Sequence, residues 1–142
     1  MKITIDTNVL VRAHGKAFGT AQQLLEVIVR KRHELILSSS ILYELEEVLH
    51  YPKIRKMTCM TDPEITTFVQ WLTRASKLVD LGTPTPFPIR DYDDWMVLRK
   101  AIMGEADVLC TCDRHLHHRG LEPIYRRAGI EVLTDVELLK RL

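Results

Sequence analysis

The sequence predicts an α/β protein, a three-layer α/β/α sandwich around a central parallel sheet of about four to five strands. Short apolar, β-branched runs alternate with longer stretches whose apolar residues recur at helical spacing, and this alternation is typical of a parallel sheet. The chain has 142 residues, of which 46% are hydrophobic and 27% charged, which is the composition of one ordinary globular domain. We therefore expect residues 1–142 to form a single domain.

The chain is expected to open with a strand, a helix and a second strand. MKITIDTNVLV is apolar and β-branched enough for a buried strand, which Asp6 ends. GTAQQLLEVIVRKRHE should be helical, because apolar residues recur on one side of it, namely Leu24, Leu25, Ile28 and Val29. LILSSS then reads as a strand that ends in hydroxyl groups.

Two helices are predicted next. The serines of LILSSS can cap ILYELEEVLHYPKIRKM, whose regular part should end near Tyr51 because Pro52 follows. TDPEITTFVQWLTRASKLV begins with the helix-start residues Thr61, Asp62 and Pro63, and its apolar stripe is Ile65, Phe68, Val69 and Leu72.

The carboxyl-terminal part begins with LGTPTPFPIRDYDD, which holds four of the six prolines and is expected to be an extended connection. A helix in WMVLRKAIMGE and a buried strand in ADVLCTCD follow. The tail IEVLTDVELLKRL should form a short strand and then a helix capped by Thr134 or Asp135.

Composition limits the cellular locations and the partners that we expect for this chain. No stretch approaches the roughly 20 apolar residues of a membrane span, and the amino terminus lacks the pattern of a secretory signal. Three cysteines do not make a disulfide framework. We therefore expect a cytoplasmic protein without a membrane partner. Lys plus Arg total 20 against 19 Asp plus Glu, so any nucleic-acid contact must come from local charge.

Carboxylates occur at four places that a parallel sheet would bring towards one edge, where ligands of such sheets bind. They are Asp6 at a strand end, Glu44 early in a helix, Asp91, Asp93 and Asp94 at a helix start, and Asp113 at a strand end. Each alone is more often a helix cap or a solvated surface group. Together they would repel one another unless a cation neutralised them, and Mg²⁺ or Mn²⁺ prefers such oxygen ligands. A site of this kind could hydrolyse phosphodiesters.

Helical geometry distinguishes Asp94 from Asp93, but it does not distinguish Glu44 from Glu46. Asp94 shares a face with Leu98 and Ala101, so it should point towards the sheet, whereas Asp93 is rotated away. In the helix after LILSSS, the apolar stripe leaves Glu47 outward and puts Glu44 and Glu46 on opposite borders. Periodicity does not choose between those two. Asn8 and Thr111 are candidates for hydrogen bonds to the carboxylates or to a metal-bound water.

The order of IDTNVL, ILYEL, DYDDWMVLRKA and ADVLCTCD resembles the PIN domain family of metal-dependent ribonucleases along nearly the whole chain. The resemblance implies that Asp6, Glu44, Asp94 and Asp113 hold Mg²⁺ or Mn²⁺, and it favours Glu44 over Glu46. It also allows Asp91 a supporting role beside Asn8 and Thr111.

The same resemblance implies an RNA substrate, single-stranded or structured, and products that carry a 5′-phosphate and a 3′-hydroxyl. Small PIN proteins resemble toxins of toxin–antitoxin pairs, which implies an antitoxin protein and a homodimer as further partners.

One segment departs from the family pattern. TCDRHLHHR has Cys112 before the aspartate, where a small residue is more usual, and three histidines after it. Zinc is an alternative there, but Cys110-x-Cys112 lacks the Cys-x₂₋₄-Cys spacing of trusted zinc sites, so we favour buried thiols that pack as small hydrophobic groups. Basic clusters could contact RNA phosphates if they lie near the strand ends, and these clusters are RHLHHR, RKRH, PKIRK and RRAG.

Two other functions compete with the nuclease. A catalytically silent PIN-like module could bind RNA or protein, although the presence of all four acids argues against it. A haloacid-dehalogenase-type phosphatase also begins with an aspartate after an apolar strand, but that chemistry needs a second aspartate where Asn8 stands.

Overall fold

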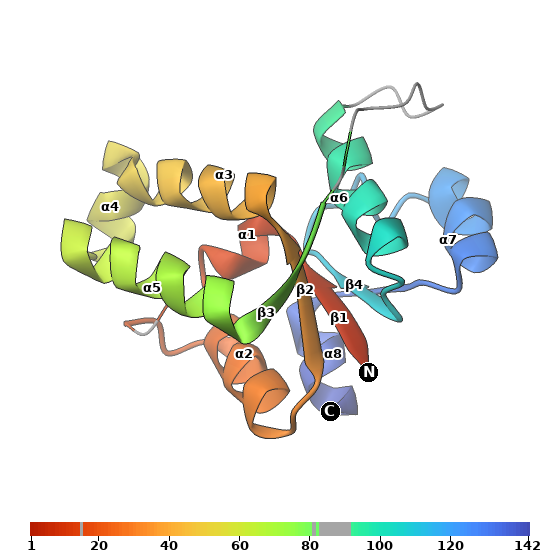
Figure 1. Cartoon of the computed structure of the whole chain (residues 1–142), viewed down its shortest axis with the longest axis horizontal. Coiled ribbons are helices and arrows are strands. Elements are labelled where there is room, and N and C mark those ends of the chain that lie inside the picture. The colour runs from red at the N-terminus through yellow and green to blue at the C-terminus, as the bar shows by residue number, and fades with distance from the viewer. Residues whose placement is uncertain (15, 81, 83–91) are drawn as a thin grey trace.

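A computed structural model describes residues 1–14, 16–80, 82 and 92–142, without the side chains of 92–94, and shows a parallel sheet between two layers of helices (Figure 1). The strands are β1 (Lys2–Ile5), β2 (Glu34–Ser38), β3 (Ser76–Val79), β4 (Val108–Cys110) and β5 (Glu131–Leu133). All neighbouring pairs run parallel, in the order β3-β2-β1-β4-β5. The predicted α/β class is therefore confirmed.

Eight α-helices and one short 3₁₀ helix lie within the described residues. They are α1 (Thr7–Leu10), α2 (Thr20–Arg30), α3 (Ser39–His50), α4 (Pro52–Thr58), α5 (Asp62–Ala75), α6 (Tyr92–Met103), η1 (Arg119–Leu121), α7 (Glu122–Ala128) and α8 (Asp135–Arg141). No helix among them is long and apolar enough to cross a membrane.

Alternate residues of the strands build the two cores. Ile3, Ile5 and Leu35 belong to a cluster shared with α1, α2, α3, α5 and α8, whereas Ile36 and Leu109 belong to a cluster with α6 and α7. Figure 1 shows the same division, with α6 and α7 on one side of the sheet and α2 and α8 on the other. Both sheet faces are thus covered, as a parallel sheet requires.

The strand order places a topological switch point beside β1. From β1 the chain adds β2 and β3 on one side, and then crosses back to add β4 and β5 on the other. Connections leave in opposite directions at the carboxyl ends of β1 and β4, which opens a crevice there. Asp6 directly follows β1, and Asp113 is separated from β4 by Thr111 and Cys112.

Several helix starts agree with the sequence. Ser38 caps α3 through Ile41 N, and Thr61 and Thr134 cap α5 and α8 in capping boxes with Glu64 and Glu137. The cap of the last helix is therefore Thr134.

Other parts of the prediction were wrong or incomplete. The first strand ends at Asp6 as expected, but α1 was not anticipated in the rest of that apolar run; the Asp6 carboxylate accepts a hydrogen bond from Thr7 N and starts this helix. Residues 76–79 form β3 and do not extend the helix before them. This edge strand is only partly buried, so no apolar run marks it. Val29 is 41% exposed and lies off the buried stripe of α2, and α4, η1 and α7 were not anticipated.

Helix α6 lies very close to the sheet at its carboxyl end. A Cβ added to Gly104 would lie 2.4 Å from Cγ2 of Ile36, so only glycine fits there. This contact, together with the packing of α6 against β1, β2 and β4, fixes the helix that carries Asp94.

Candidate active site

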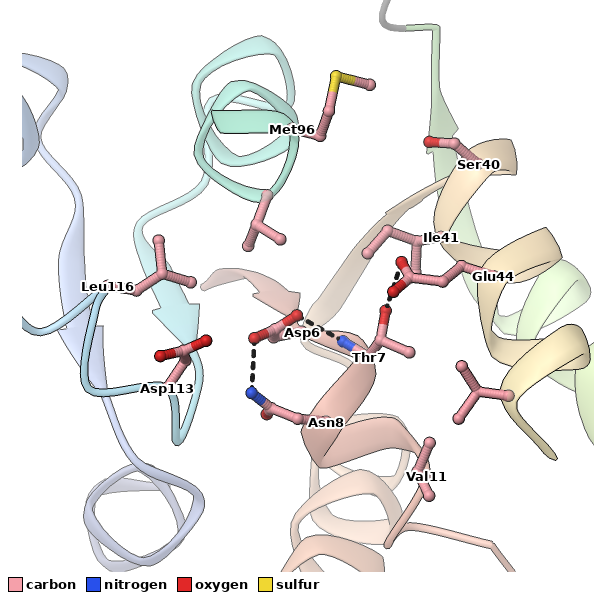
Figure 2. Close-up of a pocket in the computed structure, with 12 residues that line it drawn as sticks. Asp6, Thr7, Asn8, Val11, Ser40, Ile41, Glu44, Met96, Asp113 and Leu116 are labelled. Carbon is pink, nitrogen blue, oxygen red and sulfur yellow. Dashed lines mark hydrogen bonds between the residues drawn. The ribbon is translucent and has the colours of Figure 1, made fainter. Parts of the chain in front are cut away.

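A cavity of about 550 Å³ lies at the carboxyl ends of the central strands, and its size falls in the roughly 300–1,000 Å³ range of ligand pockets (Figure 2). Its polar lining includes three of the predicted carboxylates, those of Asp6, Glu44 and Asp113. The remaining lining residues are Thr7, Asn8, Val11, Ser40, Ile41, Val48, Met96, Val97 and Leu116. The cavity therefore combines an acidic floor with apolar walls.

The Asp6 carboxylate is oriented by three hydrogen-bond donors. Its Oδ1 accepts from Thr7 N at 2.7 Å, and its Oδ2 accepts from Asn8 Nδ2 at 2.8 Å and from Thr111 Oγ1 at 2.7 Å. Only 7% of Asp6 is exposed, so these donors compensate much of the cost of burying the charge. Figure 2 shows Asp6 on the cavity side of the strand end.

Thr111 connects the two aspartates of the switch point. Its hydroxyl donates to Asp6 and accepts from Asp113 N at 3.0 Å, while its side chain is completely buried. The Asp113 carboxylate accepts from His115 N at 2.9 Å, and His117 Nε2 lies 2.9 Å from Thr111 O. The segment after β4 is thus held at several atoms, and Asp113 lies next to Asp6 at the edge of the cavity (Figure 2).

Glu44 enters the cavity from the neighbouring helix. It lies in the second turn of α3, and its Oε2 accepts a 3.0 Å hydrogen bond from Thr7 Oγ1. Glu46 does not line the cavity. The structure therefore places Glu44, and not Glu46, beside Asp6.

The other two predicted acids are less completely defined. Asp94 lies in the first turn of α6, and its side chain is outside the described part of the chain. Met96 and Val97 of the same helix line the cavity, so the amino-terminal part of α6 borders the site. Asp91 lies outside the described residues.

Lys100 is a residue of this site that the sequence prediction missed. It is completely buried, and its Nζ donates a 2.8 Å hydrogen bond to Ile5 O, the carbonyl just before Asp6. Burial lowers the pKa of Lys100 to about 8, against the opposing effect of the Asp6 and Glu44 charges. The sequence did contain an indication that Lys100 is buried. This lysine follows Val97 by one helical turn, which puts it on the apolar side of its helix.

The two cysteines after β4 differ in environment. Cys110 is buried in the core, as predicted, and burial raises the pKa of its thiol. Cys112 is exposed, and its sulfur contacts Arg12 and Asp135, so it does not pack as a buried hydrophobic group.

The donor set fits a hard divalent cation. The carboxylates of Asp6, Glu44 and Asp113 and the hydroxyl of Ser40 offer oxygen atoms, which Mg²⁺ and Mn²⁺ prefer, and Mg²⁺ keeps several waters when few carboxylates bind it. Among the described side chains, no three His, Cys, Asp or Glu groups are close enough together to hold an ion. A cation here would therefore use water in addition to the described carboxylates.

The four basic clusters lie in different parts of the fold. RHLHHR follows Asp113 at the carboxyl edge, and the first cluster, RKRH, lies between the end of α2 and the start of β2 at the opposite edge. PKIRK belongs to α4, and RRAG ends α7 just before β5 begins. Only RHLHHR directly adjoins a residue of the acidic cavity.

Fold and site together define a doubly wound α/β protein with an acidic pocket at its switch point. A family model described as PIN domain matches residues 2–115. The chain therefore belongs to the PIN domain family, whose members are generally nucleases and typically depend on divalent metal ions. Comparison with curated proteins found no match, and neither did comparison with solved structures.

Proposed function

We propose that this protein is a divalent-metal-dependent endoribonuclease whose site is formed by Asp6, Glu44, Asp94 and Asp113. The observation that carries the proposal is the convergence of Asp6, Glu44 and Asp113 on one cavity at the switch point of a PIN domain. Asp94 joins the set because it opens the helix whose next turn borders that cavity.

Each side chain has a distinct part in this proposal. Asp6, Glu44, Asp94 and Asp113 would hold one or two Mg²⁺ or Mn²⁺ ions. When bound, such an ion lowers the pKa of a water and offsets charge on the scissile phosphate. Thr111 and Asn8 hold the Asp6 carboxylate in a fixed orientation. Lys100 supplies a buried positive charge behind the carboxylates.

The cavity also provides contacts for the rest of an RNA chain. Ile41, Met96 and Leu116 form apolar walls against which a sugar or base can pack. Arg114 and Arg119 are exposed just beyond Asp113, where phosphates of a bound strand can be neutralised. Single-stranded RNA suits such a site because its bases are accessible.

The deciding experiment is cleavage of end-labelled single-stranded RNA by purified protein in Mg²⁺, Mn²⁺ or EDTA. Asp6→Asn and Asp94→Asn test the proposed site, and Glu46→Gln is the matched control because Glu46 does not line the cavity. We expect metal-dependent cutting by the wild type and the control, and none by the two site variants. Retained cutting by Asp94→Asn would remove that residue from the site.

A catalytically silent module is the main competing function. It predicts salt-dependent RNA binding without cleavage under any metal, by protein that is folded by circular dichroism. A toxin role, an antitoxin partner and a homodimer stay predictions from the family resemblance. Light scattering after size-exclusion chromatography tests the dimer.

A further inference from the structure

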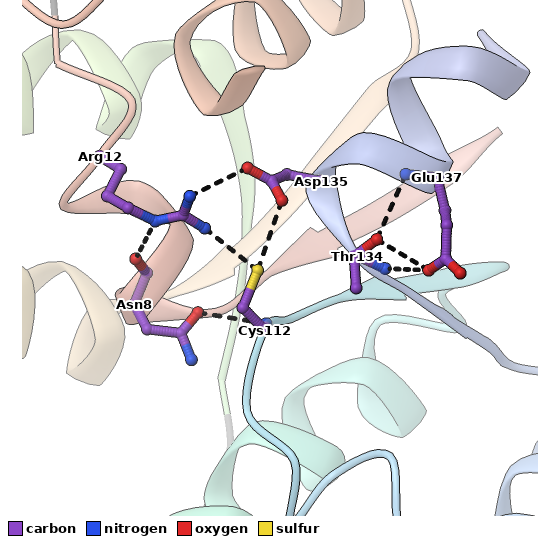
Figure 3. Close-up of polar contacts among 6 residues, drawn as sticks. All are labelled: Asn8, Arg12, Cys112, Thr134, Asp135 and Glu137. Carbon is purple, nitrogen blue, oxygen red and sulfur yellow. Dashed lines mark hydrogen bonds and ion pairs between the residues drawn. The ribbon is translucent and has the colours of Figure 1, made fainter. Parts of the chain in front are cut away.

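A polar network beside the cavity joins α1 to the start of α8 (Figure 3). Arg12 is at its centre. Its Nη1 donates to Asp135 Oδ2 at 3.1 Å, its Nη2 to Cys112 Sγ at 3.1 Å, and its Nε to Asn8 O at 3.3 Å. Cys112 closes the network, because its thiol donates to Asp135 Oδ1 at 3.4 Å.

Asp135 is not needed as a helix cap. Thr134 already caps α8, with its hydroxyl bound to Glu137 N. Asp135 is nevertheless only 3% exposed, and a carboxylate buried in this way needs a cation. Arg12 is that cation, and the fork of its guanidinium reaches three partners at once, which a lysine could not do.

The network ends on atoms that hold the catalytic carboxylates. Arg12 binds the carbonyl of Asn8, and Cys112 N approaches Asn8 Oδ1 at 3.5 Å. The amide of Asn8 in turn donates to Asp6 Oδ2, and Cys112 directly precedes Asp113. Arg12 and Asp135 do not line the cavity themselves, so any effect on the site must pass through these neighbours.

We propose that Arg12 and Asp135 are positioning residues that fix Asn8 and the Cys112–Asp113 turn relative to Asp6. This inference rests on the proposed metal-dependent site. It also assigns a role to α8, which lies beyond residues 2–115 of the family match. The Arg12–Asp135 ion pair thereby restrains Asn8, which donates to the Asp6 carboxylate, and Cys112, which directly precedes Asp113.

The test uses Asp135→Asn, Arg12→Lys and the double variant Arg12→Met/Asp135→Asn. Asp135→Asn removes the buried charge, and the guanidinium that it leaves is 46% exposed and can be solvated, so the fold should survive. Lys2→Met is the control, because the Lys2–Glu105 ion pair also joins distant segments but lies at the opposite edge of the sheet.

Two readouts are measured on each variant. One is the side-chain amide resonance of Asn8 in ¹⁵N-edited NMR spectra without metal, and the other is the affinity for Mn²⁺ by calorimetry. We expect Asp135→Asn to shift the Asn8 resonance and weaken Mn²⁺ binding about tenfold, the range of losses seen when partners of ligand residues are removed. The double variant should be impaired at least as much as Asp135→Asn, because it also removes the contacts of Arg12 with Asn8 O and Cys112 Sγ. Arg12→Lys should lie between Asp135→Asn and wild type.

The outcomes separate this inference from the proposed function. An unmoved Asn8 resonance in Asp135→Asn overturns the positioning role, whatever the enzyme does. A shifted resonance with unchanged Mn²⁺ affinity shows that Asn8 moves without consequence for the metal site, which also overturns it. If wild-type protein binds Mn²⁺ and its affinity falls in Asp135→Asn but not in Lys2→Met, the positioning role is supported even where RNA cleavage is absent.

Discussion

The ammonium nitrogen of Lys100 donates a 2.8 Å hydrogen bond to the carbonyl oxygen of Ile5, directly behind the carboxylate of Asp6. Lys100 is fully buried, and its positive charge interacts electrostatically with the carboxylates of Asp6 and Glu44. The protein therefore places a cation of its own behind the carboxylates of the acidic cavity. A cation of this kind reduces the repulsion among the carboxylates.

This burial makes stability depend on pH in a defined direction. The pKa of Lys100 is about 8 in the folded chain, whereas a solvated lysine of the unfolded chain has a pKa of 10.5, so the unfolded state binds more protons between these values. Stability should therefore rise with pH through this window. Between pH 7 and 9.5 the gain of wild type over Lys100→Met should be about 2 kcal/mol.

Urea unfolding at several pH values measures this difference. Lys53, exposed on α4, is the control for the loss of one lysine, and the same series on Lys53→Met isolates the effect of burial. A difference between wild type and Lys100→Met that stays flat or falls with rising pH would contradict the lowered pKa of the buried Lys100.

The two strand-end aspartates should differ in their contribution to stability. Asp6→Asn weakens three hydrogen bonds to a nearly buried charge and removes an anion that opposes the burial cost of Lys100, so it should cost about 2–3 kcal/mol. Asp113 is less buried and accepts from His115 N, so Asp113→Asn should cost about 1 kcal/mol or less. Chemical denaturation without metal measures the free energy of unfolding of each variant. Equal decreases in Asp6→Asn and Asp113→Asn would show that the described contacts of Asp6 do not stabilise the fold.

Much of the fold could be predicted because local signals were strong where the chain is well buried. The capped starts of α3, α5 and α8 and the apolar runs of β1, β2 and β4 are of this kind. Short elements at the edge were missed. β3 is partly exposed and α1 is a single turn, so neither leaves a periodic pattern, and the start of α1 depends on the side chain of Asp6.

The residues of the candidate site that line the cavity were predictable to the extent that they follow strand ends. Asp6 and Asp113 were found in this way, and Glu44 could be separated from Glu46 only by the family pattern until the cavity was seen. Lys100 and Asp135 were missed because their roles depend on contacts across the fold, with Ile5 and Arg12 respectively. From the local sequence, Asp135 was predicted only as a possible cap of the last helix, and no role was predicted for Lys100.

The hydroxyl of Thr111 should be needed for more than packing. Thr111→Val keeps the shape of the side chain but removes the donor to Asp6 and the acceptor of Asp113 N, so it should lower stability by about 1–3 kcal/mol. We also expect weaker Mn²⁺ binding, because the Asp6 carboxylate loses a donor and the backbone N–H of Asp113 loses its acceptor. Thr111→Ser keeps the hydroxyl and is the control. If valine and serine variants bind Mn²⁺ equally well by calorimetry, the hydroxyl does not orient the site.

Glu44 offers a test that separates charge from hydrogen bonding. Glu44→Gln keeps an oxygen that can accept from Thr7 Oγ1, so the contact between α1 and α3 should persist and stability should change by less than about 1 kcal/mol. The negative charge towards the cavity is lost, which should weaken Mn²⁺ binding and RNA cleavage about tenfold or more. Glu46→Gln removes the same charge two residues away on the same helix, outside the cavity, and should leave both properties unchanged. The two variants have the same net charge and change the same helix. Equal effects would therefore mean that Glu44 acts only through the general electrostatic field of α3, and the proposed ligand set would then reduce to Asp6, Asp94 and Asp113.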